Sequence, residues 1–102
     1  MGNDDSDRVG CLVHNDGDDV AVAVRDLEPG GVPVAWLDSG RRGEVVVTER
    51  VPLGHKVALV DMPEGHKVVE YLEQIGLTKC ALKAGSHVHT HNLRSARWQR
   101  SA

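Results

Sequence analysis

Three of the six histidines in the 102-residue sequence alternate with other residues near its C-terminal end. His87, His89 and His91 are separated by Val88 and Thr90. Successive side chains of an extended strand point to opposite faces, so the three imidazoles are expected on one face. Neutral imidazole is a common metal ligand, and strand histidines at i and i+2 can bind one divalent ion whose remaining positions stay open. The spacing alone is equally compatible with a metal site and with a polar strand edge.

Two other positions carry side chains suited to acid-base chemistry or to carboxylate binding. His55 and Lys56 follow a Pro-Leu-Gly turn, where a side chain can be held at the mouth of a strand. A histidine there can act as an acid or base near neutral pH, and a lysine can bind a substrate carboxylate. Arg94 follows the histidine cluster, and its planar guanidinium can hold a carboxylate through two hydrogen bonds. The alternative for His55 and Lys56 is an exposed pair on a half-buried strand. His14 and His66, single histidines beside turns, are expected to be structural.

Charge and motifs exclude several classes of protein. The net charge is −3, from 12 basic and 15 acidic residues, which argues against a nucleic-acid binder. No phosphate-binding glycine loop, nucleophile elbow or Cys-x-x-Cys pair occurs, so P-loop, serine-hydrolase and zinc-ribbon proteins are excluded. The longest apolar run, Val20–Val24, is far shorter than the roughly 20 residues that span a bilayer. Met1–Arg8 has no apolar stretch of the kind found in a secretory signal, so we expect a cytoplasmic protein. Cys11 and Cys80 lie in apolar surroundings, so we expect both to be buried free thiols.

Composition predicts a mainly β fold that positions these residues. The sequence has 16 valines, one isoleucine and no phenylalanine, and its eleven glycines and four prolines supply many turns. The length suits a single domain, which we place at residues 8–95 between an acidic lead, 1–7, and a tail, 96–102. The patterns predict these extended segments: Val9–His14 and Val20–Val24 as one hairpin, Val32–Leu37 and Glu44–Glu49 as a second, and then His55–Val60, Leu77–Leu82 and His87–His91.

Two details of this scheme matter later. Pro33 is expected to keep its strand at a sheet edge, because proline lacks the N–H that an inner strand donates. The segment His66–Gly76 is compatible both with a strand and with a short helix, because its apolar residues fit either period.

Four segments, taken in order, carry a family resemblance. They are Asp19–Ala23, Arg25–Gly30, Val51–Leu59 and Gly85–Ser95. From about His14 to Ser95 this order resembles the small subunit, or N-terminal domain, of the altronate and galactarate dehydratase family. Gly-His-Lys before a strand, together with His-x-His-Asn near the end, is a specific pair of motifs. The same module is similar to the alpha subunit of sulfolactate sulfo-lyase, so the resemblance does not fix the substrate.

The resemblance implies a SAF-type domain of β-clip architecture and favours extended backbone in the ambiguous segment. One departure is visible, because Tyr71-Leu72 stands where family members tend to have Tyr-Gly, and a leucine there could allow a local helix. The resemblance further implies a lyase subunit that needs a large dehydratase or lyase subunit, is inactive alone, and acts on a small hydroxy acid. Its cofactor would be a divalent metal ion, Fe²⁺ or Mn²⁺ by resemblance, with Zn²⁺ as an alternative.

On these grounds we expect a small subunit of a hydro-lyase that dehydrates an altronate-type sugar acid to a 2-keto-3-deoxy acid. The expected roles are catalysis by His55 and His89, metal binding by His87, His89 and His91, and carboxylate binding by Lys56 and Arg94. The alternatives are a sulfolactate sulfo-lyase alpha subunit, a non-catalytic SAF module that binds a carbohydrate or a partner protein, and metal storage by the histidine strand.

Overall fold

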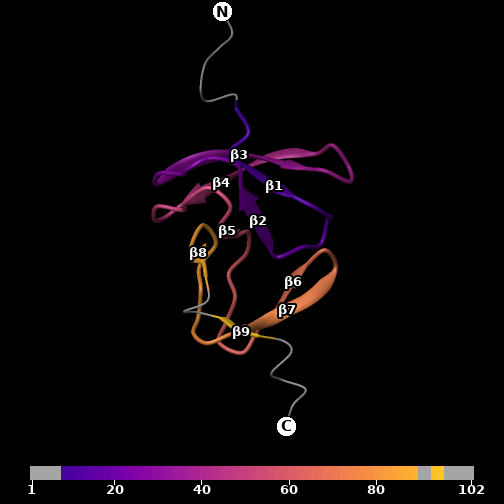
Figure 1. Cartoon of the computed structure of the whole chain (residues 1–102), viewed down its shortest axis with the longest axis vertical. Helices are drawn as coiled ribbons and strands as arrows, with labels where there is room; N and C mark the ends of the chain where they lie inside the picture. Colours follow the sequence, from indigo (N-terminus) through magenta and orange to yellow (C-terminus); the bar gives the residue numbers. More distant parts are fainter. Residues whose placement is uncertain (1–7, 90–92, 96–102) are drawn as a thin grey trace, which may run out of the picture.

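The computed structural model describes residues 8–89 and 93–95, and the regular elements assigned within these ranges are all β-strands (Figure 1). The mainly β prediction is confirmed. No helix in the described ranges is long and apolar enough to cross a membrane. The strands are β1 (Cys11–Val13), β2 (Val20–Ala23), β3 (Gly30–Trp36), β4 (Arg42–Val47), β5 (Lys56–Ala58), β6 (Lys67–Glu70), β7 (Glu73–Thr78), β8 (His87–Val88) and β9 (Leu93–Ser95).

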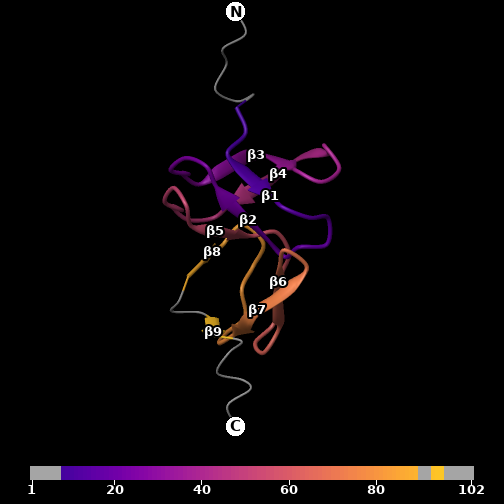
Figure 2. The ribbon, with the colours of Figure 1, turned by 45° about the vertical axis from the view of Figure 1, so that its right-hand side comes forward.

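The strands form two sheets, which occupy the upper and lower parts of Figures 1 and 2. The six-stranded sheet has the order β4-β3-β1-β2-β5-β8, and the three-stranded sheet has the order β6-β7-β9. The two predicted hairpins are present, since β1 pairs antiparallel with β2 and β3 pairs antiparallel with β4. The pairing of β1 with β3 is parallel and joins the hairpins into one sheet.

The predicted edge position of Pro33 is wrong, because β3 lies between β4 and β1. The carbonyl of Pro33 accepts a hydrogen bond of 2.8 Å from the N–H of Gly10, one residue before β1 begins at Cys11. In a strand, the N–H and C=O groups of one residue point toward the same neighbouring strand. The nitrogen of Pro33 therefore points toward the residues that precede β1. Proline is therefore tolerated in this inner strand, because the pairing with β1 has not yet begun opposite the proline nitrogen.

Both faces of the six-stranded sheet bury apolar side chains, in two separate clusters. The first cluster includes Ala21 and Ala23 of β2 and Val57 of β5. The second cluster includes Val20 of β2 and Ala58 of β5. Because neighbouring residues of one strand enter opposite clusters, β2 and β5 are buried on both faces, and small alanines alternate with valines along β2.

The segment left open between strand and helix forms the β6–β7 hairpin. Its two turn residues, Tyr71 and Leu72, have positive φ angles of 57° and 61°, as in a type I′ hairpin turn. The carboxylate of Asp18 accepts hydrogen bonds of 3.0 Å from both turn N–H groups and one of 3.2 Å from the N–H of Asn15. This carboxylate stabilises a conformation that otherwise favours glycine, so the departure at Leu72 produces no helix.

The two cysteines have different surroundings. Cys11 is fully buried in β1, and burial raises the pKa of its thiol to about 11, against a smaller lowering effect of Arg25. Cys80 is exposed, so the prediction that it is buried is wrong. It lies in a bend just after β7, where the chain leaves the sheet.

Candidate functional site

The pairing of β5 with β8 brings three histidines together at one end of the six-stranded sheet. Lys56 lies opposite Val88 in this antiparallel pair, so His55, which precedes β5, is beside the residues of β8. The Nδ1 atom of His55 lies 2.8 Å from the Nε2 atom of His87, and the two ring centroids are 4.9 Å apart. The rings of His87 and His89 have centroids 4.7 Å apart. The same-face prediction for the i and i+2 pair thus agrees with the structure, and His55 joins it from a distant segment.

Glycine turns position both strands of this pair. Gly54 has a φ of 86°, and its N–H donates to the carbonyl of Ala23 at 2.8 Å. Gly85 has a φ of 93°, and a Cβ atom there would collide with the carbonyl oxygen of Val46. The chain therefore needs glycine before β8 for two independent reasons, conformation and space. These turns fix where His55 and His87 enter the sheet.

The electrostatic surroundings keep His87 neutral. Burial lowers the pKa of His87, and the neighbouring imidazoles of His89 and His55 lower it further, while the Glu49 carboxylate acts in the opposite direction. Glu49 also accepts a hydrogen bond of 3.1 Å from the backbone N–H of His87. A neutral imidazole has one ring nitrogen with a free electron pair, so it can accept a proton or bind a metal ion. In the contact between His55 and His87, one ring donates the hydrogen bond and the other accepts it.

The predicted metal set of His87, His89 and His91 stays a prediction. His91 lies outside the described residues. Within 8–89 and 93–95, no three His, Cys, Asp or Glu side chains form a group that could hold a metal ion. The convergence of His55 and His87 nonetheless places two imidazole nitrogens together, and imidazole is a donor that suits Fe²⁺ and Zn²⁺ better than it suits Mn²⁺.

The two residues predicted to bind carboxylates lie apart from this cluster. Lys56 follows His55 directly and so projects from the opposite face of β5. Its Nζ atom is 3.6 Å from Oε1 of Glu70, whose side chain is only 7% exposed. Glu70 also lies 4.0 Å from His14, and the His14 ring stacks on Tyr71 with centroids 3.9 Å apart. Arg94 lies in β9, which belongs to the three-stranded sheet, whereas β8 belongs to the larger one.

Sequence reasoning missed two acidic residues beside histidines. Glu49 contacts His87 across 38 residues of chain, and no local pattern points to it. Asp19 lies 3.0 Å from Nε2 of His66 and accepts a hydrogen bond of 2.9 Å from the N–H of Val69. Asn15-Asp16-Gly17-Asp18 has the residue types of a turn, yet the carboxylates of Asp18 and of Asp19, which follows it, bind the β6–β7 hairpin.

Known proteins are similar to this chain over most of its length. Residues 9–96 match the altronate/galactarate dehydratase SAF domain. The (2R)-sulfolactate sulfo-lyase subunit alpha of Chromohalobacter salexigens is 35% identical over 89 residues, which cover 85% of this chain and 95% of that protein. The altronate dehydratase of Escherichia coli is 38% identical over 78 residues, which cover 76% of this chain but 15% of that enzyme. The galactarate dehydratase (L-threo-forming) of the same organism is 34% identical over 76 residues, 13% of its length. The chain thus matches nearly all of one relative and a small part of two others.

Proposed function

This chain belongs to the altronate/galactarate dehydratase SAF-domain family, and from that premise we propose that it is the small subunit of a heteromeric lyase acting on a hydroxylated carboxylic acid. The observation that carries the proposal is the histidine cluster, in which Nδ1 of His55 and Nε2 of His87 are 2.8 Å apart. His55 is exposed, so its ring is accessible to a second chain. A domain of this size encloses little of a substrate by itself, and a larger chain would supply most of the pocket.

The proposed reaction is a β-elimination. The C–H bond next to the carboxylate breaks, its proton passes to a base, and its electron pair forms a carbon–carbon double bond. The substituent on the next carbon leaves with the electron pair of its own bond, either as water after protonation or as sulfite. The enol product then tautomerises to a 2-keto acid. An acid and a base near neutral pH are therefore required, and a hydrogen-bonded pair of imidazoles supplies both.

The residues are assigned to these tasks as follows. His87, whose pKa is lowered mainly by burial, would orient the His55 ring for proton transfer through their 2.8 Å contact. His55 and His89 remain the proposed catalytic residues, and His87, His89 and His91 the proposed metal ligands. A divalent ion bound there would stabilise negative charge on the substrate carboxylate as the proton leaves. Arg94 is kept as a proposed carboxylate contact, whereas Lys56 would have to leave Glu70 to take that role.

Two substrate classes fit this chemistry, and the comparisons favour one of them. The motifs alone place dehydration of an altronate-type sugar acid first. The match covers 95% of a sulfo-lyase alpha subunit and 15% of altronate dehydratase, so this domain makes up almost the whole of that sulfo-lyase subunit. We therefore place elimination of sulfite from sulfolactate before dehydration in this proposal.

The test is reconstitution with the large lyase chain of the same organism. The complex is assayed with sulfolactate, altronate and galactarate, with and without added Fe²⁺, Mn²⁺ or Zn²⁺. His55→Gln and the double variant His89→Ala/His91→Ala should each lower turnover by about a hundredfold or more. Glu64→Gln, at an exposed residue outside the histidine cluster, serves as the control and should retain turnover.

Two other results would replace the proposal. Full turnover in the double variant would favour a non-catalytic SAF module, because a binding module does not need these imidazoles. Stoichiometric metal binding by the chain alone, with no turnover in any complex, would favour metal storage.

A further inference from the structure

The tip of the β6–β7 hairpin presents two large apolar side chains to solvent. Tyr71 and Leu72 are 57% and 61% exposed. Both have the left-handed backbone conformation that side chains other than glycine disfavour. Strained residues with exposed apolar side chains gain nothing for the isolated fold, and such strain gathers at sites of function.

The tip is held rigidly in place. Asp18 is buried, and its carboxylate accepts the N–H groups of both Tyr71 and Leu72 at 3.0 Å. On the other side of the tip, the Tyr71 ring stacks on His14. An apolar anchor that is already ordered loses little conformational entropy when it enters a partner, which favours binding.

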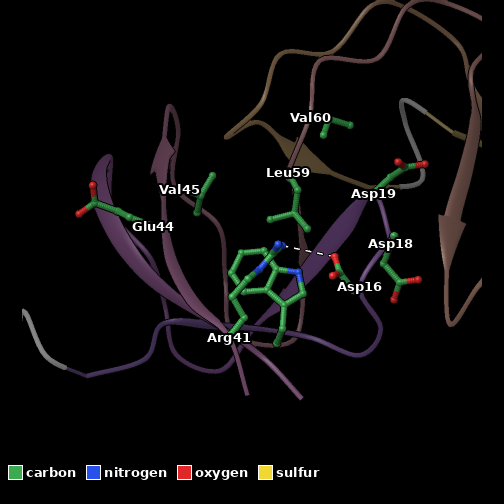
Figure 3. A pocket seen from close by; sticks show the side chains of 10 residues that line it. Asp16, Asp18, Asp19, Arg41, Glu44, Val45, Leu59 and Val60 are labelled. Atoms are coloured by element: carbon green, nitrogen blue, oxygen red, sulfur yellow. Dashed lines mark hydrogen bonds and ion pairs between the residues drawn. The ribbon is translucent and has the colours of Figure 1, made fainter. Parts of the chain in front are cut away.

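A pocket of about 380 Å³ lies beside the tip (Figure 3). Gly17 and Asp18 line it, and a Cβ atom on Gly17 would be 3.7 Å from Cδ2 of Leu72. The pocket and the tip therefore adjoin at Gly17 and Asp18. Val60, a lining residue that is 43% exposed, adds an apolar margin.

The lining of the pocket is acidic. Its charged residues are four carboxylates and one guanidinium: Asp16, Asp18, Asp19, Glu44 and Arg41. The guanidinium lies 4.2 Å above the Trp36 ring and pairs with Asp16 at 3.4 Å, while Asp18 and Asp19 accept hydrogen bonds from backbone N–H groups of the β6–β7 hairpin. Backbone N–H groups carry no net charge, so the lining keeps more negative than positive charge. Figure 3 shows the three aspartates on one side of the pocket and Glu44 on the other. This lining repels an anionic acid and complements a cationic side chain.

We propose that this docking surface, made of the Tyr71–Leu72 tip and the acidic pocket, binds the large lyase chain. The large chain would offer an apolar recess for Tyr71 and Leu72 and a lysine or arginine that enters the pocket. The inference rests on the proposed function, because it takes its partner from there. The β6–β7 hairpin and β8 lie on opposite sides of the molecule in Figures 1 and 2, so the large chain would contact both sides of this domain.

The decisive variant is Leu72→Gly. Glycine suits a φ of 61°, so this substitution removes the apolar side chain while the fold keeps its thermal midpoint. The dissociation constant for the large chain, measured by titration calorimetry, should rise about tenfold or more. Val46→Thr is the matched control, because Val46 is 62% exposed, lies on β4 and is not part of the docking surface, and it should leave the constant unchanged.

A second variant tests the pocket. Glu44→Gln removes one negative charge from an exposed residue, so it should weaken binding severalfold, and added salt should weaken binding of the variant less than that of the unchanged chain.

The outcomes separate the two proposals. If the unchanged chain does not bind the large chain, the proposed function fails and the docking surface fails with it. If the unchanged chain binds but Leu72→Gly binds equally well, the docking surface alone is overturned. The docking surface is also overturned if Leu72→Gly abolishes self-association of this chain, measured by sedimentation, while binding to the large chain is unaltered.

Discussion

Replacing Asp18 by alanine should destabilise the protein substantially, because one buried carboxylate connects the two sheets. The residue is 6% exposed and accepts three backbone N–H groups, from Asn15, Tyr71 and Leu72, at 3.2, 3.0 and 3.0 Å. Hydrogen bonds to a charged group contribute about 1.5–3 kcal/mol each when the partner is left unsatisfied. Water can reach the exposed turn after the substitution, so we take the lower part of this range. With about 1.5 kcal/mol for each of the bonds from Tyr71 and Leu72, and little for the longer local bond from Asn15, the expected loss in the free energy of unfolding is about 3 kcal/mol.

The loss should appear as a fall in thermal midpoint of roughly 12–24 °C at pH 7, since about 1 kcal/mol corresponds to 4–8 °C in a domain of this size. Circular dichroism in the β region measures it. Asp38→Ala is the matched control, because Asp38 is exposed and accepts only the Asp16 N–H, at 2.9 Å, among the hydrogen bonds described for it. Its cost should remain below about 1 kcal/mol.

A double-mutant cycle shows whether the carboxylate acts through the turn. In the Asp18→Ala background, Leu72→Gly should recover about 1 kcal/mol, because glycine adopts the positive φ without the carboxylate. In the unchanged protein the same substitution should be nearly neutral, because relief of strain offsets the flexibility of glycine. Equal effects of Leu72→Gly in both backgrounds, or an Asp18→Ala cost no greater than that of Asp38→Ala, would refute the reasoning.

Three more outcomes are expected. In an NMR titration His87 should show a pKa below its ordinary value of 6.5, and His55→Gln should move that pKa upward. Because the unfolded chain takes up this proton first on acidification, the stability that His87 contributes above about pH 6.5 is lost as the pH falls through its folded pKa; stability independent of pH between 7 and 5 would contradict this. Gly85→Ala should cost about 3 kcal/mol or more, because the added methyl meets the Val46 carbonyl at a φ of 93°, and an unaltered urea midpoint would count against it. A thiol reagent should label the exposed Cys80 at once, and should label the buried Cys11, whose pKa is raised, only on unfolding. If the native Cys80→Ser variant is labelled as much as the unchanged native protein, this prediction is wrong.

Local patterns in the sequence predict most of the strands and both early hairpins. The turn signals between Val9–His14 and Val20–Val24 are short-range, and antiparallel neighbours need no other information. The strand order is not visible in such patterns. The parallel contact of β1 with β3 depends on which faces of the finished sheet are covered. The error at Pro33 has the same origin, because the point at which β1 begins decides whether the missing N–H matters.

The candidate site was predictable to the same extent. The side-by-side placement of His87 and His89 follows from the period of two. That period also places Lys56 on the face opposite His55, so their grouping in one site could have been questioned from the sequence. The contact of His55 with His87 required the pairing of β5 with β8. The turn at Leu72 depends on Asp18, which is 54 residues away, and no local propensity contains that information.

The distance along the chain between the paired histidines also bears on the order in which the protein folds. His55 and His87 are 32 residues apart, and the entropy lost on closing a loop grows with its length. The β1–β2 and β3–β4 hairpins close much shorter loops, so they can form within microseconds and before the longer contact. A chain that has closed only these hairpins still has the imidazoles of His55 and His87 far apart. Pairing of β8 with β5 is then the folding step that first brings the imidazoles of His55 and His87 into contact.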